Sequence, residues 1–373
     1  DLWRFDPATH RLTLVAATGP GPRARAVLLA DDSASGPGRL LLVGGVVGDS
    51  PEDGPLWQFE HASGTWSSLD VPVAQRGCIG AALEPDTRSL RIVRTDTADG
   101  VSSLDTVALD TLAATRETVA VPYRTEAAFA SRGGILYVHG GRNKGGVPTA
   151  DLFRIRADGT VEKLDPTGQL KARTLHAMAA LDDGSLVVHG GIGPGGEPVS
   201  DVVRFVPGAD GKPCVLETIT PVPSLPLVMP ALGTGGGYVW LFSGMQADRR
   251  GFRQLLRFDP SLVQWTQVLL EVSPSARAQG TLEVVRSRKQ ALIIGGYTED
   301  LVEARLVDDL WALSLVDGTF KRISPAGTFP GFVQGATAVD EAEQALYVHG
   351  GLSGPPGSGA PAVGRISRLW LDD

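Results

Sequence analysis

A short apolar run that ends in a pair of small residues recurs along this chain about every fifty residues. Successive copies are 96, 50, 53, 52 and 55 residues apart. The first interval equals two periods of 48 and predicts a degenerate copy near residue 94, where SLRIVRTD (Ser89–Asp96) has a strand pattern without glycines. Seven copies of one supersecondary unit are therefore expected. The six clear copies read LLLVGG to Gly45, LYVHGG to Gly141, LVVHGG to Gly191, VWLFSG to Gly244, ALIIGG to Gly296 and ALYVHGG to Gly351.

Three further segment types accompany each run. A strand of alternating apolar residues follows it, as in PLWQFE from Pro55 and DLWALS from Asp309. A shorter segment with an aromatic comes next, as in TWSSL from Thr65, and a segment of small residues such as HAMAAL from His176 precedes each run. Four short strands in each of seven copies predict an all-β fold, a seven-bladed β-propeller of four-stranded antiparallel blades.

Composition agrees with this fold and excludes several classes. The 373 residues include 47 glycines and 26 prolines, too many for a helical bundle because both residue types disfavour helix interiors. Only 20% of residues are charged and 42% are apolar, which argues against disorder. The net charge of −8 disfavours nucleic acid as a partner. No apolar run approaches 18 residues, so we expect no membrane insertion.

The repeated residues resemble the kelch repeat, whose second strand ends in a diglycine and whose next two strands carry aromatic residues, with a period near fifty. Arg173 and His176 in ARTLHAMAAL also match the Arg-x-x-His that precedes strand one in that family. The resemblance covers essentially the whole chain, although the second copy lacks the glycines. It implies a propeller scaffold without specifying a function, because kelch propellers serve many unrelated roles.

The ends of the chain predict how the ring would close. The chain begins with third and fourth strands and ends with the first three strands of a repeat, so we expect Leu12–Val15 to complete the last blade and remove an open edge. Asp1–Asp6 and Arg368–Asp373 both have the third-strand pattern, so one of them could be displaced or add an edge strand. A start within a repeat, without Met, indicates part of a larger protein or assembly. Within one domain, 1–373, the predicted blades are 22–71, 74–121, 122–166, 171–221, 222–271, 273–325, and 329–373 with 1–15.

No residue pattern predicts a catalytic residue, a cofactor or a metal site. The glycine pairs open no helix with Gly-x-Gly-x-x-Gly spacing and are expected to allow close packing. His139, His189 and His349 precede glycine pairs in three different blades, too far apart to share one ion. We expect these histidines to be packed and hydrogen-bonded between blades. Cys78 and Cys214 are too few for a disulfide framework.

A partner-binding surface is predicted on one face of the propeller. The loops after strands two and four share that face, and the loops after strand two are long and variable, which is where binding residues concentrate. Arginines gather at these loops, and arginine is enriched at interfaces. In the alternative interpretation they pair with loop acids such as Glu126 or Glu299 and only solvate the rim. The candidate residues are Arg25, Arg124, Arg142, Arg173, Arg249, Arg250, Arg253 and Arg277.

Three functional hypotheses follow. The first is a non-catalytic interaction or scaffold module that docks a protein, a peptide or a glycan on the loop face. The second is an enzyme that acts on a sugar or another small molecule at the central channel, which would require a cluster of His, Glu or Arg directed at the axis. The third is a purely structural domain of a larger protein. The recurrent scaffold and the lack of a convergent catalytic set favour the first.

Overall fold

The structure is a computed structural model. It describes residues 2–6, 11–15, 19–32, 38–47, 50–51, 54–73, 76–95, 102–165, 170–208, 215–219, 227–246, 252–299, 304–323, 331–343, 345–354 and 366–370. For the strands at 2–6, 11–15 and 366–370 it describes the backbone only.

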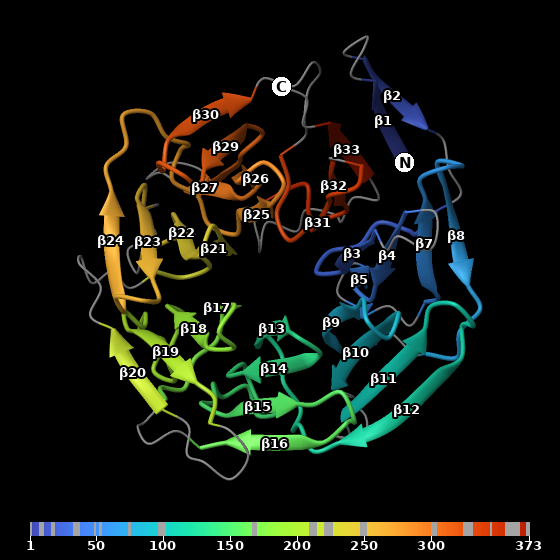
Figure 1. Cartoon of the computed structure of the whole chain (residues 1–373), viewed down its shortest axis with the longest axis horizontal. Helices are drawn as coiled ribbons and strands as arrows, with labels where there is room; N and C mark the ends of the chain where they lie inside the picture. Colours follow the sequence, from blue (N-terminus) through green and yellow to red (C-terminus); the bar gives the residue numbers. More distant parts are fainter. Residues whose placement is uncertain are drawn as a thin grey trace.

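Six four-stranded antiparallel sheets stand around a central axis as the blades of a β-propeller (Figure 1). In each blade, successive strands are neighbours, and the first strand lies closest to the axis. The degenerate copy predicted near residue 94 forms a regular blade despite its missing glycines. Blade I contains β3 (Val27–Asp31), β4 (Arg39–Val43), β7 (Leu56–Glu60) and β8 (Thr65–Leu69), and blade II contains β9 (Cys78–Glu84), β10 (Ser89–Thr95), β11 (Ser102–Ala108) and β12 (Ala114–Val119). Blade III contains β13 (Ala128–Arg132), β14 (Ile135–His139), β15 (Leu152–Ile155) and β16 (Val161–Leu164), and blade IV contains β17 (Ala177–Ala180), β18 (Leu186–His189), β19 (Val202–Val206) and β20 (Val215–Ile219). Blade V contains β21 (Ala231–Gly235), β22 (Tyr238–Phe242), β23 (Leu255–Asp259) and β24 (Gln264–Val268), and blade VI contains β25 (Thr281–Val285), β26 (Gln290–Ile294), β29 (Leu310–Ser314) and β30 (Phe320–Ile323).

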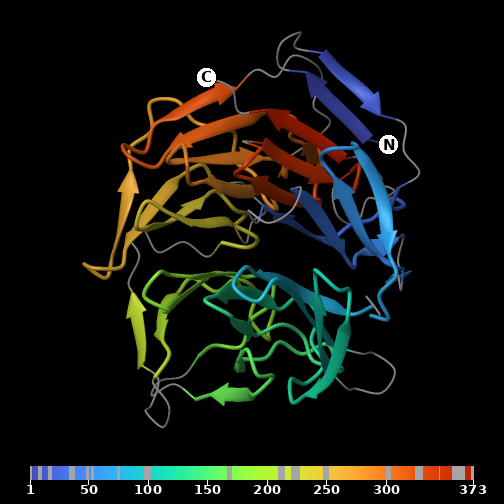
Figure 2. The ribbon, with the colours of Figure 1, turned by 45° about the vertical axis from the view of Figure 1, so that its right-hand side comes forward.

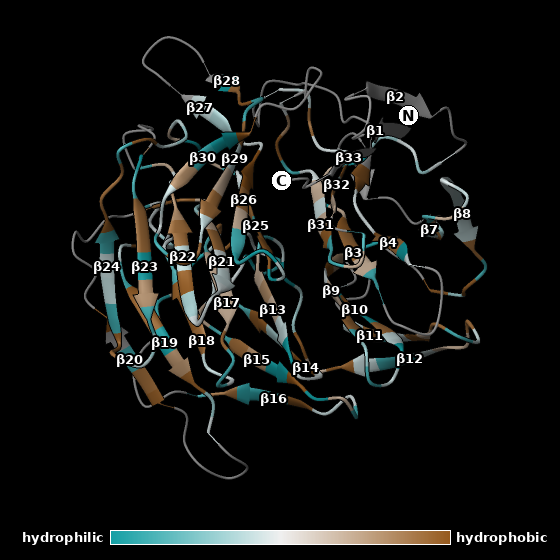
Figure 3. Ribbon diagram, turned by 45° about the horizontal axis from the view of Figure 1, so that its top comes forward, coloured by the Kyte–Doolittle hydropathy of each residue, from teal (hydrophilic) through white to brown (hydrophobic). Residues whose placement is uncertain are grey.

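Two small hairpins decorate the loops between the second and third strands. The strands β5 (Val46–Val47) and β6 (Ser50–Pro51) pair in blade I, and β27 (Tyr297–Glu299) and β28 (Ala304–Leu306) pair in blade VI. The second hairpin projects beyond the blades in Figure 3. The same view shows hydrophobic residues along the strands of blades IV to VI, with the loops mostly hydrophilic.

The remaining sheet does not have the form of the six blades. It contains five strands in the order β2 (Arg11–Val15), β1 (Leu2–Asp6), β33 (Ile366–Trp370), β32 (Ala345–His349) and β31 (Ala336–Asp340). We call it the terminal sheet. Its last three strands are antiparallel, whereas β1 lies beside β33 in parallel over only two residue pairs. Figure 2 shows the N-terminal hairpin at the outer rim.

The predicted count of seven four-stranded antiparallel blades and the predicted closure are therefore wrong. Leu12–Val15 does not pair with the last strand, because residues 2–6 form a five-pair antiparallel hairpin with residues 11–15 and so occupy the inner edge of that hairpin. The strand that pairs with β33 is β1, and the two strands run parallel, whereas an antiparallel pair was predicted. Neither terminal third-strand segment is an edge strand, because β1 lies between β2 and β33 and the edge is β2. The predicted blade boundaries stay predictions.

The hydrophobic core is divided into clusters, one between each sheet and the next. Between blades I and II, for example, Leu41 and Leu56 pack against Leu90 and Ile92, all fully buried. Between the terminal sheet and blade I, Leu40 and Leu42 meet small residues of β31 and Tyr347 of β32. Since each sheet is held by the two sheets beside it, the arrangement depends on contacts between successive repeats.

Backbone hydrogen bonds from the small-residue pairs join successive sheets. The amide of the second glycine in one sheet donates to the carbonyl of the residue that leads into the next sheet's first strand. Blade II has no glycine pair, and there the Thr95 hydroxyl donates to the Arg124 carbonyl at 3.0 Å. The glycine amide bonds run from Gly141 to Arg173, Gly191 to Leu227, Gly244 to Arg277, Gly296 to Phe332 and Gly351 to Arg23, at 2.8 to 3.0 Å.

A comparison of two glycines distinguishes the cost of a positive φ from the cost of a side chain placed where two sheets come close together. Gly190 and Gly146 both have positive φ, 73° and 77°. A Cβ at Gly190 would lie 2.2 Å from the Leu227 carbonyl oxygen, whereas a Cβ at Gly146 would meet nothing within 4 Å.

We expect Gly146→Ala to cost about 1–2 kcal/mol of unfolding free energy, the cost of the left-handed conformation alone. Gly190→Ala should cost about 1–3 kcal/mol more, because the backbone of blade V must move. Urea unfolding of both variants measures the difference, and equal losses would contradict the role assigned to the glycine pair.

Candidate functional site

Three of the predicted partner-binding arginines lie inside the protein. Arg124, Arg173 and Arg277 are at most 3% exposed, as is Arg23 in blade I. Arg173 shows the arrangement. Its Nε donates to the Lys171 carbonyl at 3.3 Å and its Nη1 to the carbonyl of Gly190, the first glycine of its own blade, at 3.1 Å. Arg23 and Arg277 make the equivalent two bonds.

An aspartate just before the third strand completes three of these sites. Arg173 Nη2 lies 2.7 Å from Asp201, Arg277 Nη2 lies 2.7 Å from Asp309, and Arg124 pairs with Asp151. Burial lowers the pKa of each guanidinium, and the aspartate opposes that effect. We call each set an arginine node. The nodes of Arg173 and Arg277 join the entry to the first strand, the end of the second and the start of the third. The node of Arg124 joins the entry to the first strand with the start of the third.

The other predicted arginines are near the surface or outside the described residues. Arg25 is exposed and its Nε donates to Gln334 Oε1 at 3.0 Å. Arg142 pairs with Glu126 at 2.9 Å, the pairing foreseen in the alternative interpretation. Arg253 is exposed. Arg249 and Arg250 lie outside the described residues, as do Cys214 and the side chain of Glu299.

The three histidines before the glycine pairs are buried between sheets, as expected, whereas the expected hydrogen bond between blades is present at His139 and absent at His189 among the described residues. His139 Nδ1 lies 2.8 Å from His176 Nε2. His189 packs edge-on against Trp265 of blade V, and neither of its ring nitrogens has a hydrogen-bond partner among the described residues. Burial lowers the pKa of His139 to about 3 and that of His189 to about 4. These rings are therefore neutral in the folded protein at neutral pH.

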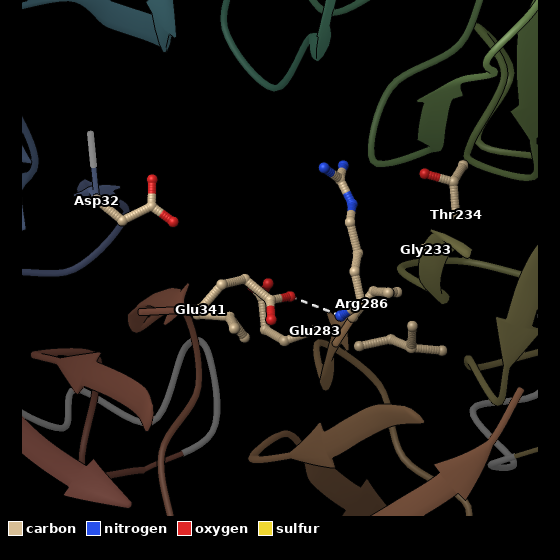
Figure 4. A pocket seen from close by; sticks show the side chains of 9 residues that line it. Asp32, Gly233, Thr234, Glu283, Arg286 and Glu341 are labelled. Carbon is tan, nitrogen blue, oxygen red and sulfur yellow. Dashed lines mark hydrogen bonds between the residues drawn. The ribbon is translucent and has the colours of Figure 1, made fainter. Parts of the chain in front are cut away.

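A cavity opens at the end of the axis opposite the predicted partner face. Each first strand begins at the predicted face and ends at this one, and Asp32, Arg286 and Glu341 follow the ends of β3, β25 and β31. The cavity volume is about 380 Å³. Thr234 and Glu283 also line it (Figure 4). We call it the axial cavity; sequence reasoning missed it.

Two of the carboxylates at the axial cavity have protein partners. The hydroxyl of Thr337 donates to Glu283 Oε1 at 2.6 Å, and burial raises the pKa of Glu283. Glu341 accepts bonds from the Arg286 amide at 2.5 Å and the Ser287 hydroxyl at 2.6 Å. A signal for Glu283 was present in the sequence: it is a charged residue at the centre of a first strand, in TLEVV, where the other first strands carry apolar, small or hydroxyl residues.

A buried polar network stands behind the axial cavity and joins blade I to the terminal sheet. Tyr347 Oη lies 3.0 Å from His61 Nδ1, and His61 Nε2 lies 2.9 Å from Asp340. Asp340 is fully buried, and its pKa is lowered because its bonds to His61 and to backbone amides outweigh the effect of burial. The network fixes the end of β31, from which Val339 and Glu341 reach the axial cavity.

Among the described residues, no group of three or more His, Cys, Asp and Glu side chains is placed to hold a metal ion. No helix in the described ranges is long and apolar enough to span a bilayer.

The fold and these sites define a β-propeller. No protein-family model matches the chain. Among solved structures, that of YjhT is similar: 82% of this chain superposes on 97% of that chain with a TM-score of 0.58 and 14% sequence identity. At this identity the similarity supports the fold alone.

Blade V provides a natural template for testing an arginine node. Leu227 stands at the arginine position and Gln254 at the aspartate position. We expect Arg173→Leu to cost about 3 kcal/mol of unfolding free energy, because Asp201 keeps a buried charge without its partner. The double variant R173L/D201Q copies blade V and should recover part of that loss. Chemical denaturation measures both, and a double variant no more stable than R173L would contradict the ion-pair explanation.

The buried histidines predict acid sensitivity. Their folded-state pKa lies below the unfolded value of about 6.5, so the unfolded chain binds protons first and stability falls as the pH drops from about 6.5 towards 4. His189→Phe, which copies Phe242 of blade V, should remove about 1.4 kcal/mol per pH unit from this slope. Urea titrations between pH 7 and pH 5 test it. An unchanged slope would show that His189 does not titrate on unfolding.

Proposed function

We propose that this chain is a non-catalytic interaction or scaffold module of the kelch-repeat type. It binds a protein or peptide partner through the face that carries the loops after strands two and four. The observation that carries the proposal is that the loops after the second strands of blades III and IV, which are described in full, are held by internal hydrogen bonds. Asn143 Oδ1, for example, accepts the amides of Gly145 and Val147, both at 3.0 Å. A preformed surface loses little conformational entropy on binding, which favours affinity.

Burial divides the predicted arginines into two groups. Arg25, Arg142 and Arg253 are accessible. The polar contacts of the Arg25 and Arg142 side chains are worth only about 0–1 kcal/mol, so a partner can replace them at small cost. Arg124, Arg173 and Arg277 are committed to arginine nodes, and we assign them to the scaffold. Arg249 and Arg250 stay predictions. Because guanidinium groups bind carboxylates in a bidentate manner, an acidic segment is the partner chemistry that fits this face.

A matched pair of triple variants tests the face. R25A/R142A/R253A removes three accessible arginines from the proposed surface. R132A/R156A/R322A removes the same charge from turns on the opposite face and from an outer strand. Immobilised chains are exposed to a lysate of the source cells, and the captured proteins are quantified by mass spectrometry.

We expect the first triple variant to reduce capture of the specifically bound proteins at least about tenfold, equivalent to 1.4 kcal/mol. The control should capture them at the wild-type level. Equal capture by both variants would place the interaction elsewhere.

A second candidate is an enzyme that acts on a sugar or another small molecule at the central channel. It is favoured by the axial cavity, in which Glu283 has a raised pKa and a single hydroxyl partner. A carboxyl group with a raised pKa suits general acid–base chemistry.

A further inference from the structure

Two polar side chains of the axial cavity, the guanidinium of Arg286 and the hydroxyl of Thr234, have no hydrogen bond or ion pair within the described part of the chain. The carboxylate of Asp32 has only a bond to its own backbone there, and Asp32 and Arg286 are both exposed. In Figure 4, Arg286 extends into the space between Asp32 and Thr234. Polar groups that converge on a cavity without satisfying one another are typical of a ligand site.

The charged side chains of the axial cavity come from separate sheets, so they cannot easily move into direct contact with one another. Asp32 follows β3 of blade I, whereas Arg286 follows β25 of blade VI, and the terminal sheet stands between these two blades. Glu283 projects from β25, with one oxygen bonded to Thr337. The axial cavity therefore presents one cation and three carboxylates, those of Asp32, Glu283 and Glu341, at different points of its wall, with Val284 and Val339 as apolar lining.

The surroundings favour a cationic group near Asp32. Burial raises the pKa of Asp32, a bond to its own backbone opposes this effect, and the charges of Asp340, Asp31 and Glu341 raise the pKa further. Asp31 and Asp340 are already paired, with Arg39 and His61. A bound ammonium group would relieve the remaining repulsion and give Asp32 a cationic partner, which it lacks among the described residues.

We propose that the axial cavity binds a small zwitterion whose ammonium and carboxylate groups are joined by a short methylene chain, an ω-amino acid. The carboxylate pairs with Arg286, the ammonium lies between Asp32 and Glu283, and the methylenes lie along Val284 and Val339. A volume of about 380 Å³ is in the range of small-molecule sites, about 300–1,000 Å³. The proposal takes its location from the second candidate function and requires no reaction. Its failure would leave the partner-binding face untouched.

Isothermal titration calorimetry with a matched set of compounds tests the ligand chemistry. The set is 5-aminopentanoate and γ-aminobutyrate as zwitterions, butylamine as the cation alone, butyrate as the anion alone, and glucose as a neutral polyol. We expect the better zwitterion to bind at least about tenfold more tightly than either singly charged compound, the contribution of one charge-assisted hydrogen bond.

Two conservative variants and one control test which side chain binds the carboxylate of the ligand and which binds its ammonium group. R286Q should weaken the zwitterion about tenfold and leave butylamine unchanged, whereas D32N should weaken both the zwitterion and butylamine. R322Q removes an exposed arginine from an outer strand of the same blade VI and should change neither. Thermal melting confirms that each variant is folded.

Three results would overturn the proposal: no measurable binding of any zwitterion, equal binding of zwitterion and butylamine by the wild type, or tighter binding of glucose. The last would support the sugar-directed enzyme instead. A sugar turned over with loss of activity in E283Q, without zwitterion binding, would establish the second candidate function while rejecting this ligand.

Discussion

The structure depends on how one sheet is joined to the next at the entry to each first strand. A glycine amide from the preceding sheet donates to the backbone carbonyl at the entry to blades I, IV, V and VI and the terminal sheet, and the Thr95 hydroxyl does so at the entry to blade III. In blades III, IV and VI the same residue is an arginine whose side chain reaches an aspartate before the third strand, and in blades I, IV and VI it reaches the first glycine carbonyl. One residue thus fixes its own blade with its side chain and the neighbouring blade with its backbone. The apolar clusters between sheets supply the larger burial, but these bonds set the spacing.

Much of the fold could be predicted because the same residue pattern recurs in successive copies of the repeat. The degenerate copy at Ser89–Thr95 was found from the period alone, and the structure gives it four strands. The terminal sheet could not be predicted in the same way. Asp1–Asp6 and Arg368–Asp373 have the same third-strand pattern, so the pattern cannot decide which of them occupies the position; the C-terminal strand in fact spans Ile366–Trp370. The choice rests on the hairpin that residues 2–6 form with their own neighbours.

The arginines show that a pattern of residue types does not reveal the direction of a side chain. Their positions could be read from the sequence, but whether each side chain turns outwards or into the sheet could not, because these residues precede the regular strand. A correlation within the chain carried the missing information. Arg124, Arg173 and Arg277 occur with Asp151, Asp201 and Asp309, whereas Leu227 occurs with Gln254. The axial cavity could not be predicted because its residues lie in or just after the first strands of different sheets, which only the fold brings together.

The residue at the entry to the first strand differs in chemistry from sheet to sheet, so the contacts between sheets should respond differently to temperature. At Leu227 and Phe332 the entry residue is apolar, and its side chain contributes burial instead of an ion pair. Apolar burial weakens on cooling, while charge-assisted bonds do not share that temperature dependence. Blade V and the terminal sheet are thus the sections expected to exchange their amide protons first in the cold, and the blades with arginine nodes the last. A ring of near-identical repeats would in this way have a defined order in which it opens.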